Sequence, residues 1–129
     1  MRDALSKLNM PPELRKALRE ALARLVELAK PEVVILFGSW AEGRARPDSD
    51  VDLVVVARTN NRWHLARRLY LQWHESMTEF RDLPSADLLV YTPGQFDDAL
   101  LVGFPAYQAV RHGVVVYGRI PAVAEWVAA

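Results

Sequence analysis

Apolar residues recur at intervals of three and four residues from Leu14 to Ala29. This spacing gathers them on one face of a helix. Proline is tolerated in the first turn of a helix, so Pro11 and Pro12 indicate the start, and Pro31 ends the segment. The pattern therefore predicts an amphipathic helix near the beginning of the chain.

Four short runs of mainly β-branched and apolar residues predict strands. They are bounded by Gly, Pro, Asp, Asn or Ser, as is typical of buried strands. The segment from Gly38 to Ser49 contains several turn-forming residues and predicts a loop. The predicted strands are residues 33–37, 51–57, 86–91 and 114–117.

Helical patterns lie between the later strands. Asn60 and Asn61 can cap a helix that continues to about residue 80. After the third strand a helical pattern is broken by Pro105, and its second piece stops at Gly113. Residues 121–129 predict one further short helix. Alternating strands and helices indicate an α/β or α+β fold in which helices cover a small sheet.

Composition narrows the class of protein. The chain has 129 residues, is 51% hydrophobic and carries 16 basic and 16 acidic residues, which fits one compact domain over residues 1–129. Zero net charge argues against nucleic acid as the main partner. The absence of cysteine excludes disulfides and thiolate chemistry. With no membrane-spanning run and no signal-peptide layout, we expect a cytoplasmic protein.

The most informative segment follows the first predicted strand. Gly38 lets the backbone approach a bulky anion closely. If Ser39 opens a helical turn, its N–H and hydroxyl both point at that anion. A nucleoside triphosphate is the obvious anion for such a position.

Two carboxylates open the second predicted strand. Asp50 and Asp52 are separated by one residue, so they point to the same side of a strand, with Cα atoms roughly 6.5–7 Å apart. Oxygen ligands favour a hard cation such as Mg²⁺ or Mn²⁺. An isolated Asp-x-Asp is usually a solvated loop feature, but the Gly-Ser pair before it and a later strand-borne Asp favour a metal site.

That later carboxylate is Asp87, at the start of the third predicted strand. If this strand pairs with the second, Asp87 lies next to Asp50 and Asp52. Three close carboxylates repel one another, and a divalent cation removes that penalty. Asp87 could also accept the proton of an attacking hydroxyl. A lone Asp often opens a strand from a turn, so Asp87 is the least specific of the three.

Together these motifs resemble the polymerase-β-type nucleotidyltransferases, and among them the minimal nucleotidyltransferase (MNT) proteins. The resemblance covers residues 33–118. It implies a small mixed sheet of about four strands flanked by helices. It also implies Asp50 and Asp52 as metal ligands, Asp87 as third carboxylate and base, and Gly38 and Ser39 as a phosphate cradle. The matching segments are residues 37–39, 47–53, 87, 90–93 and 113–118.

The loop departs from the family pattern. Arginines are frequent before its second glycine, where this chain has Trp40, Ala41 and Glu42. We expect Arg44 or Arg46 to supply the positive charge for the triphosphate, or Glu42 to point toward water. Ser49 is a further candidate contact of the nucleotide, although such a serine more often shapes a turn. The tyrosines, including the one at position 70, are expected to serve packing.

The resemblance also implies a reaction and a partner. MNT proteins are often antitoxins paired with a helical HEPN toxin, and some transfer AMP onto a toxin tyrosine. We therefore expect metal-dependent transfer of a nucleotide, AMP, from ATP to an acceptor hydroxyl, with Mg²⁺ or Mn²⁺ as cofactor. A chain of this length has little room for an acceptor-binding domain, so we expect a partner protein to present the hydroxyl.

Two other functions stay open at this point. The first is a binding module that occludes a partner toxin without catalysis, which the acidic residue in the loop favours and the three retained carboxylates oppose. The second is a small-molecule adenylyltransferase of the aminoglycoside-modifying kind. The acceptor, the preferred base and the presence of a homo-oligomer are also left open by the sequence.

Overall fold

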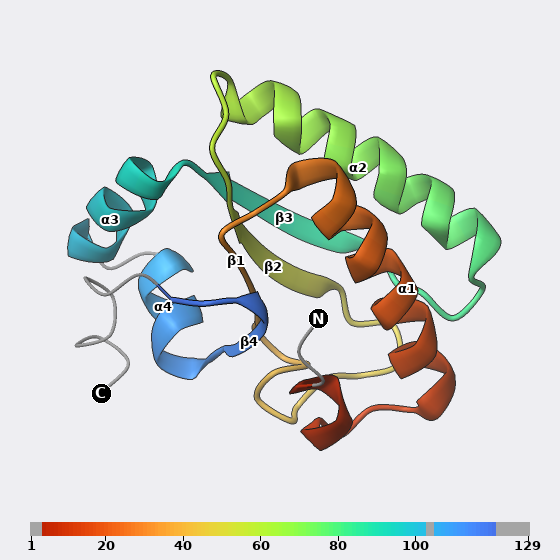
Figure 1. The fold of residues 1–129 in the computed structure, drawn as a ribbon. Helices are drawn as coiled ribbons and strands as arrows, with labels where there is room; N and C mark the ends of the chain where they lie inside the picture. The colour runs from red at the N-terminus through yellow and green to blue at the C-terminus, as the bar shows by residue number, and fades with distance from the viewer. Residues whose placement is uncertain (1–3, 103–104, 121–129) are drawn as a thin grey trace.

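The structure is a computed structural model that describes residues 4–102 and 105–120. The helix predicted for residues 121–129 lies outside the described residues. The order of elements along the chain matches the prediction, with one added 3₁₀ turn near the start (Figure 1). The elements are η1 (Ala4–Lys7), α1 (Pro12–Ala29), β1 (Val33–Phe37), β2 (Val51–Val56), α2 (Arg62–Glu79), β3 (Ala86–Tyr91), α3 (Pro93–Val102), α4 (Pro105–His112) and β4 (Val114–Gly118).

The four strands form one mixed sheet. Their order is β3-β2-β1-β4, with β2 parallel to β3, and with β1 antiparallel to both β2 and β4. The two central strands are apolar on both faces, as their nearly continuous apolar sequences require. The predicted fold, a small mixed sheet flanked by helices, is confirmed.

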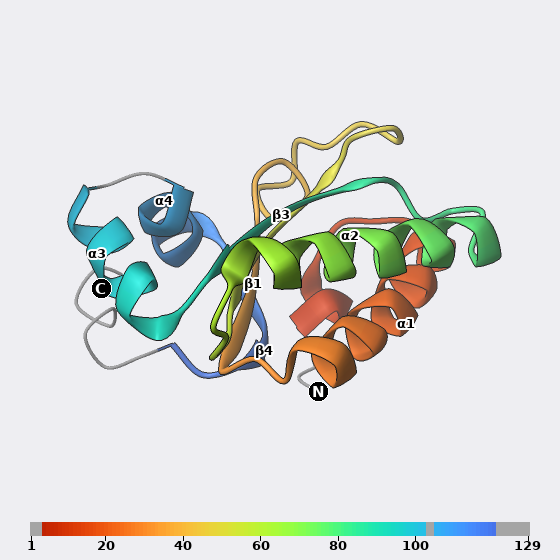
Figure 2. The same ribbon diagram turned by 90° about the horizontal axis from the view of Figure 1, so that it is seen from above.

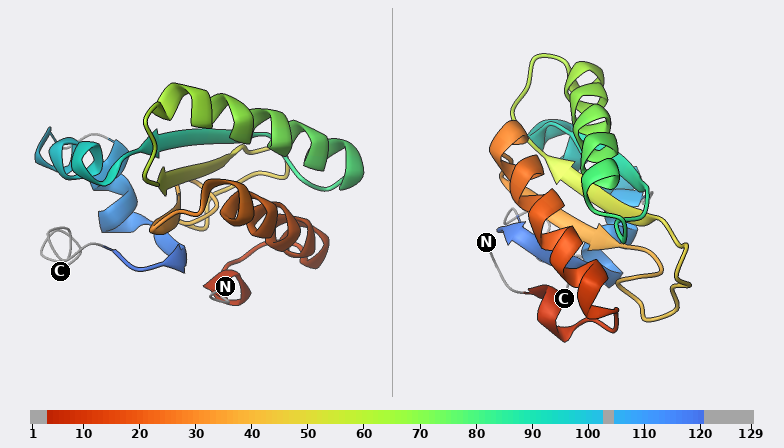
Figure 3. Two further views of the ribbon diagram at one scale, coloured as in Figure 1. Left: turned by 45° about the horizontal axis from the view of Figure 1, so that its top comes forward. Right: turned by 90° about the vertical axis from the view of Figure 1, so that its right-hand side faces the viewer.

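Helices cover the two faces of the sheet unequally. One face carries Val34, Leu36 and Leu53 and packs against α1 and α2, which lie side by side (Figure 2). The other face carries Ile35 and Val54 and packs against α3 and α4. Figure 3 shows these two helix pairs on opposite sides of the sheet.

Local sequence explains where the helices begin and end. α1 starts at Pro12 and stops at Lys30, whose left-handed backbone (φ 48°) lets its N–H bond to a carbonyl in the last turn. The Asn61 side chain caps α2 by accepting the N–H of His64 at 3.1 Å. α3 begins at Pro93, because proline is well suited to the first helical position.

None of the described helices is long and apolar enough to cross a membrane.

Candidate active site

The structure brings the predicted carboxylates to one end of the parallel pair β2–β3. Asp52 lies directly opposite Asp87 in the register of this pair. Asp50 immediately precedes β2, and its charge acts on Asp52. The pairing that the sequence left conditional is therefore present. We call this end of the two strands, with its three aspartates, the carboxylate end.

The carboxylate end is open to solvent because the helices of that face stop short of it. Alternation along β2 places Asp52 on the same face as Val54 and Val56, which are covered by α3 and α4. Asp52 itself is half-buried, whereas Asp50 and Asp87 are exposed. A ligand can therefore reach all three carboxylates from solvent.

Asp52 is the electrostatic centre of the site. Its partial burial raises the pKa of its carboxyl group above the ordinary value of 3.8, and the charges of Asp87 and Asp50 raise it further. Arg44 opposes this shift and lowers the pKa. The surroundings of Asp52 thus disfavour its ionised carboxylate, and a bound cation would stabilise that charge.

Gly38 lies directly against Asp52. Phe37, the last residue of β1, is opposite Asp52 in the register, and Gly38 follows it with a left-handed backbone (φ 74°). A Cβ atom built on Gly38 would overlap Oδ2 of Asp52, well inside the 3.0 Å that real Cβ contacts respect. Only glycine lets the loop pass this closely to the carboxylate.

After Gly38 the chain makes a single helix-like turn. The N–H of Glu42 donates to the carbonyl of Gly38 at 3.1 Å. The N–H of Arg44 donates to the carbonyl of Ser39, also at 3.1 Å. Ser39 therefore opens a turn, as its predicted role in anion binding requires. Within the described part of the chain, its hydroxyl has no hydrogen-bond partner.

Trp40 anchors this loop. It is 5% exposed and belongs to the core beneath α1 and α2. Its indole N–H donates to the carbonyl of Ser49 at 3.0 Å, which ties the start of the loop to its end. The hydroxyl of Ser49 accepts the N–H of Arg46 at 2.8 Å, so this serine shapes the turn before Asp50. Its predicted contact with nucleotide stays a prediction.

The acidic residue of the loop is partly neutralised within the loop. Nη2 of Arg44 lies 3.3 Å from Oε2 of Glu42, and both side chains are substantially exposed. Arg44 also lowers the pKa of Asp52 through its charge. The guanidinium thus pairs with Glu42 and also acts on Asp52 through its charge, which is compatible with the role predicted for it.

Two neighbours of the carboxylates were missed in the sequence. The hydroxyl of Ser85 donates to Oδ1 of Asp50 at 2.5 Å. Tyr70, expected only to pack, instead places its hydroxyl 3.3 Å from Oδ1 of Asp87, and its partial burial raises its pKa above the ordinary value of 10.0. Neither residue belongs to a local motif, so no sequence signal marks them.

The donor set fits a divalent cation in its chemistry. It consists of oxygen ligands with clustered negative charge, which suits Mg²⁺ or Mn²⁺. Over residues 4–102 and 105–120, however, no three metal-binding side chains already converge on one point. Asp50 is held by Ser85 and Asp87 contacts Tyr70, and like charges keep apart. Each of these contacts uses one carboxylate oxygen, so a cation would have to draw the remaining oxygens toward one another.

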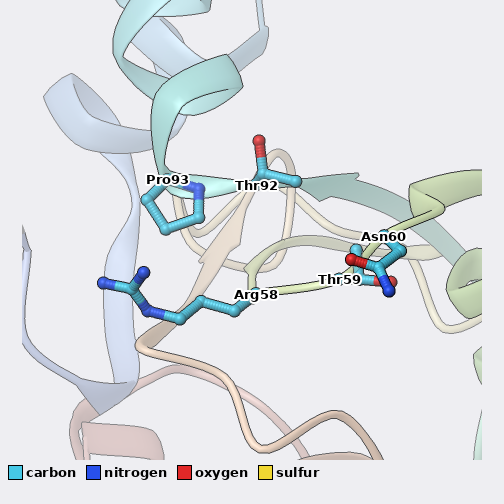
Figure 4. Close-up of a pocket in the computed structure, with 5 residues that line it drawn as sticks. All are labelled: Arg58, Thr59, Asn60, Thr92 and Pro93. Atoms are coloured by element: carbon cyan, nitrogen blue, oxygen red, sulfur yellow. The ribbon is translucent and has the colours of Figure 1, made fainter.

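A separate cavity of about 430 Å³ lies at the opposite end of β2 and β3, where both strands finish (Figure 4). We call this the cavity end. It contains none of the predicted site residues, and its one charged lining group, Arg58, pairs with Glu32 at 3.1 Å. Its lining residues are Arg58, Thr59, Asn60, Thr92 and Pro93.

Comparison with known proteins identifies the family of this chain. The sequence pattern of the nucleotidyltransferase domain matches residues 15–112, which is more than half of the chain. The protein therefore belongs to the nucleotidyltransferase domain family, and the family predicted from the motifs is confirmed. No curated protein sequence matches the chain significantly.

Solved structures share the fold. A chain in a crystal structure of a toxin–antitoxin with AMP-PNP is 22% identical, with a TM-score of 0.52 and coverage of 84% of this chain and 79% of that chain. A chain in a mutant of the toxin–antitoxin MntA-HpeT is 21% identical, with a TM-score of 0.50 and the same two coverages. At 21–22% identity, these matches show that this chain and the two solved chains share a fold.

Proposed function

We propose that this nucleotidyltransferase transfers AMP from Mg²⁺-ATP to a hydroxyl group of a partner protein. The observation that carries the proposal is the meeting of three features at one point. Asp52 and Asp87 face each other across β2 and β3, and the backbone of Gly38 passes against Asp52. Carboxylates beside a glycine turn supply a cation site and a phosphate site at contact distance.

In the proposed reaction, the acceptor oxygen attacks the α-phosphorus of ATP. A new oxygen–phosphorus bond forms, the bond from the α-phosphorus to the bridging oxygen breaks, and pyrophosphate leaves. Asp87 accepts the hydroxyl proton, because it is exposed and its contact with Tyr70 uses one of its two oxygens. Gly38 and Ser39 hold the phosphates through backbone N–H groups, and Arg44 adds positive charge.

Asp50, Asp52 and Asp87 would hold the metal. When bound, a divalent cation neutralises the triphosphate and polarises the α-phosphate. AMP and ATP are supported by the neighbouring fold that was solved with AMP-PNP. A toxin of the HEPN type as partner is supported by the motif resemblance and by the toxin–antitoxin neighbours.

The site is tested by calorimetric titration of Mg²⁺-ATP into the wild type, Asp52→Asn and Asp48→Asn. Asp48 is an exposed aspartate of the same loop and serves as the matched control. We expect saturable, Mg²⁺-dependent binding in the wild type and the control, and binding at least about 100-fold weaker in Asp52→Asn. An absence of binding at millimolar ATP in the wild type would contradict ATP as the donor.

One observation favours a second function, occlusion of the partner without catalysis. Glu42 occupies the loop that faces the triphosphate, and it draws Arg44 into an ion pair. Neutralisation of a helical partner toxin by Asp52→Asn at the wild-type level would support occlusion. Loss of neutralisation, with loss of an AMP-sized mass increase on the toxin, would support catalysis.

A further inference from the structure

Tyr70 lies on α2 and reaches across the free edge of β3. Its hydroxyl accepts the backbone N–H of Leu88 at 2.7 Å and lies 3.3 Å from Oδ1 of Asp87. The residue keeps 40% of its surface exposed. The contact therefore depends on the hydroxyl group rather than on deep burial of the ring.

The bond to Leu88 fixes where the hydroxyl lies. β3 is an edge strand. The carbonyl of Ser85, just before β3, accepts the N–H of Val51, and the carbonyl of Tyr91 accepts the N–H of Ala57, just after β2. By alternation, the backbone groups of Leu88 point to the free edge. Tyr70 thus takes the place of a neighbouring strand there, and the rigid strand holds its oxygen in position.

The hydroxyl has one proton to donate. Two acceptors are within reach, the carbonyl of Leu88 at 3.4 Å and Oδ1 of Asp87 at 3.3 Å. A hydrogen bond to an ionised carboxylate is roughly twice as strong as one between neutral groups. The carboxylate of Asp87 is therefore the favoured acceptor of the Tyr70 proton.

We propose that Tyr70 is a positioning residue that fixes Oδ1 of Asp87 at the free edge of β3 and so leaves the second carboxylate oxygen of Asp87 for metal binding. The inference rests on the proposed function, in which Asp87 is the third carboxylate of the site. Asp87 is exposed on an edge strand and faces the like charge of Asp52, which would turn it toward solvent. The bond from Tyr70 opposes that rotation.

The test measures the affinity for Mn²⁺ alone, from the paramagnetic resonance signal of free Mn²⁺, in the wild type, Tyr70→Phe and Tyr107→Phe. Tyr107 lies on α4, which packs on the opposite face of the sheet, and it is the matched control. Loss of a group that orients a metal ligand weakens metal binding by about 10–100-fold. We expect at least about tenfold weaker binding in Tyr70→Phe and no change in Tyr107→Phe, with thermal unfolding showing both variants folded.

A double-mutant cycle separates positioning from a merely structural role. If Tyr70 acts through Asp87, Tyr70→Phe has no further effect on Mn²⁺ affinity in an Asp87→Asn background. Equal losses in both backgrounds, or no loss in the single variant, would overturn the inference while leaving the proposed function intact. A wild type that binds no Mn²⁺ would overturn both.

Discussion

The two ends of the parallel pair β2–β3 differ in shape and in charge. The cavity end has the hollow, of about 430 Å³, but its single charged residue is engaged in an exposed ion pair. The carboxylate end is open, yet partial burial and the charges of Asp87 and Asp50 raise the pKa of Asp52, and a Cβ atom at Gly38 would overlap that side chain. Unfavourable charge is costly without a ligand, so it supports the carboxylate end as the proposed site more than volume supports the cavity end.

The largest effect is expected at the point where the loop meets Asp52. In Gly38→Ala, a left-handed backbone costs about 1–2 kcal/mol, and the new Cβ must push Asp52 aside. Gly43→Ala is the matched control, because it has nearly the same backbone (φ 75°) but no neighbour within 4 Å of its Cβ. Urea unfolding should show both variants destabilised, with Gly38→Ala the more affected.

The same two glycine variants also test whether the nucleotide binds at the carboxylate end. Mg²⁺-ATP binding should weaken at least about tenfold in Gly38→Ala, because displacement of Asp52 disturbs the ligand set. It should be unchanged in Gly43→Ala. Equal binding by both glycine variants would show that the nucleotide does not use this turn.

A smaller loss of stability is expected when Trp40, which anchors the loop, is replaced. Trp40→Phe removes the indole N–H that bonds to Ser49, which costs about 0.5–1.5 kcal/mol, with more if the carbonyl is left without a partner. Trp63→Phe is the control, since Trp63 is 72% exposed and surface substitutions usually stay within about 0.5 kcal/mol. Equal urea midpoints for the two variants would contradict the anchoring role of Trp40.

The raised pKa of Asp52 predicts a pH-dependent gain in stability for Asp52→Asn without metal. Because the folded protein binds this proton more tightly than the unfolded chain, stability falls as pH rises from about 3.8 through the raised pKa. Asparagine removes that cost. In buffer with a chelator, Asp52→Asn should exceed the wild type in urea midpoint at pH 7, and the difference should disappear below pH 3.8. A less stable variant at pH 7 would contradict the unfavourable charge.

The smallest effect is expected at the cavity end. Arg58→Ala removes an ion pair whose arginine side chain is 83% exposed, and such pairs contribute about 0–1 kcal/mol. Mg²⁺-ATP binding by calorimetry should equal that of the wild type. Loss of binding in Arg58→Ala would reverse the comparison, because it would place the nucleotide in the cavity.

The sequence by itself determined the helices, the strands and the core of the site. Helical and strand periodicity are local, and prolines and asparagines at the ends set the boundaries. Gly38, Ser39, Asp50 and Asp52 flank a single loop, so their proximity follows from chain connectivity. These features could be predicted because each depends on residues close together in the chain.

Only the tertiary structure decided that Asp87 faces Asp52, since this depends on β3 being the parallel neighbour of β2. The contact of Tyr70 with Asp87 joins residues of different elements, and the indole of Trp40 reaches Ser49 across the loop. Strand order and side-chain contacts of this kind arise when separate apolar faces pack together. No local pattern encodes them, because their free energy comes from burial across the whole core.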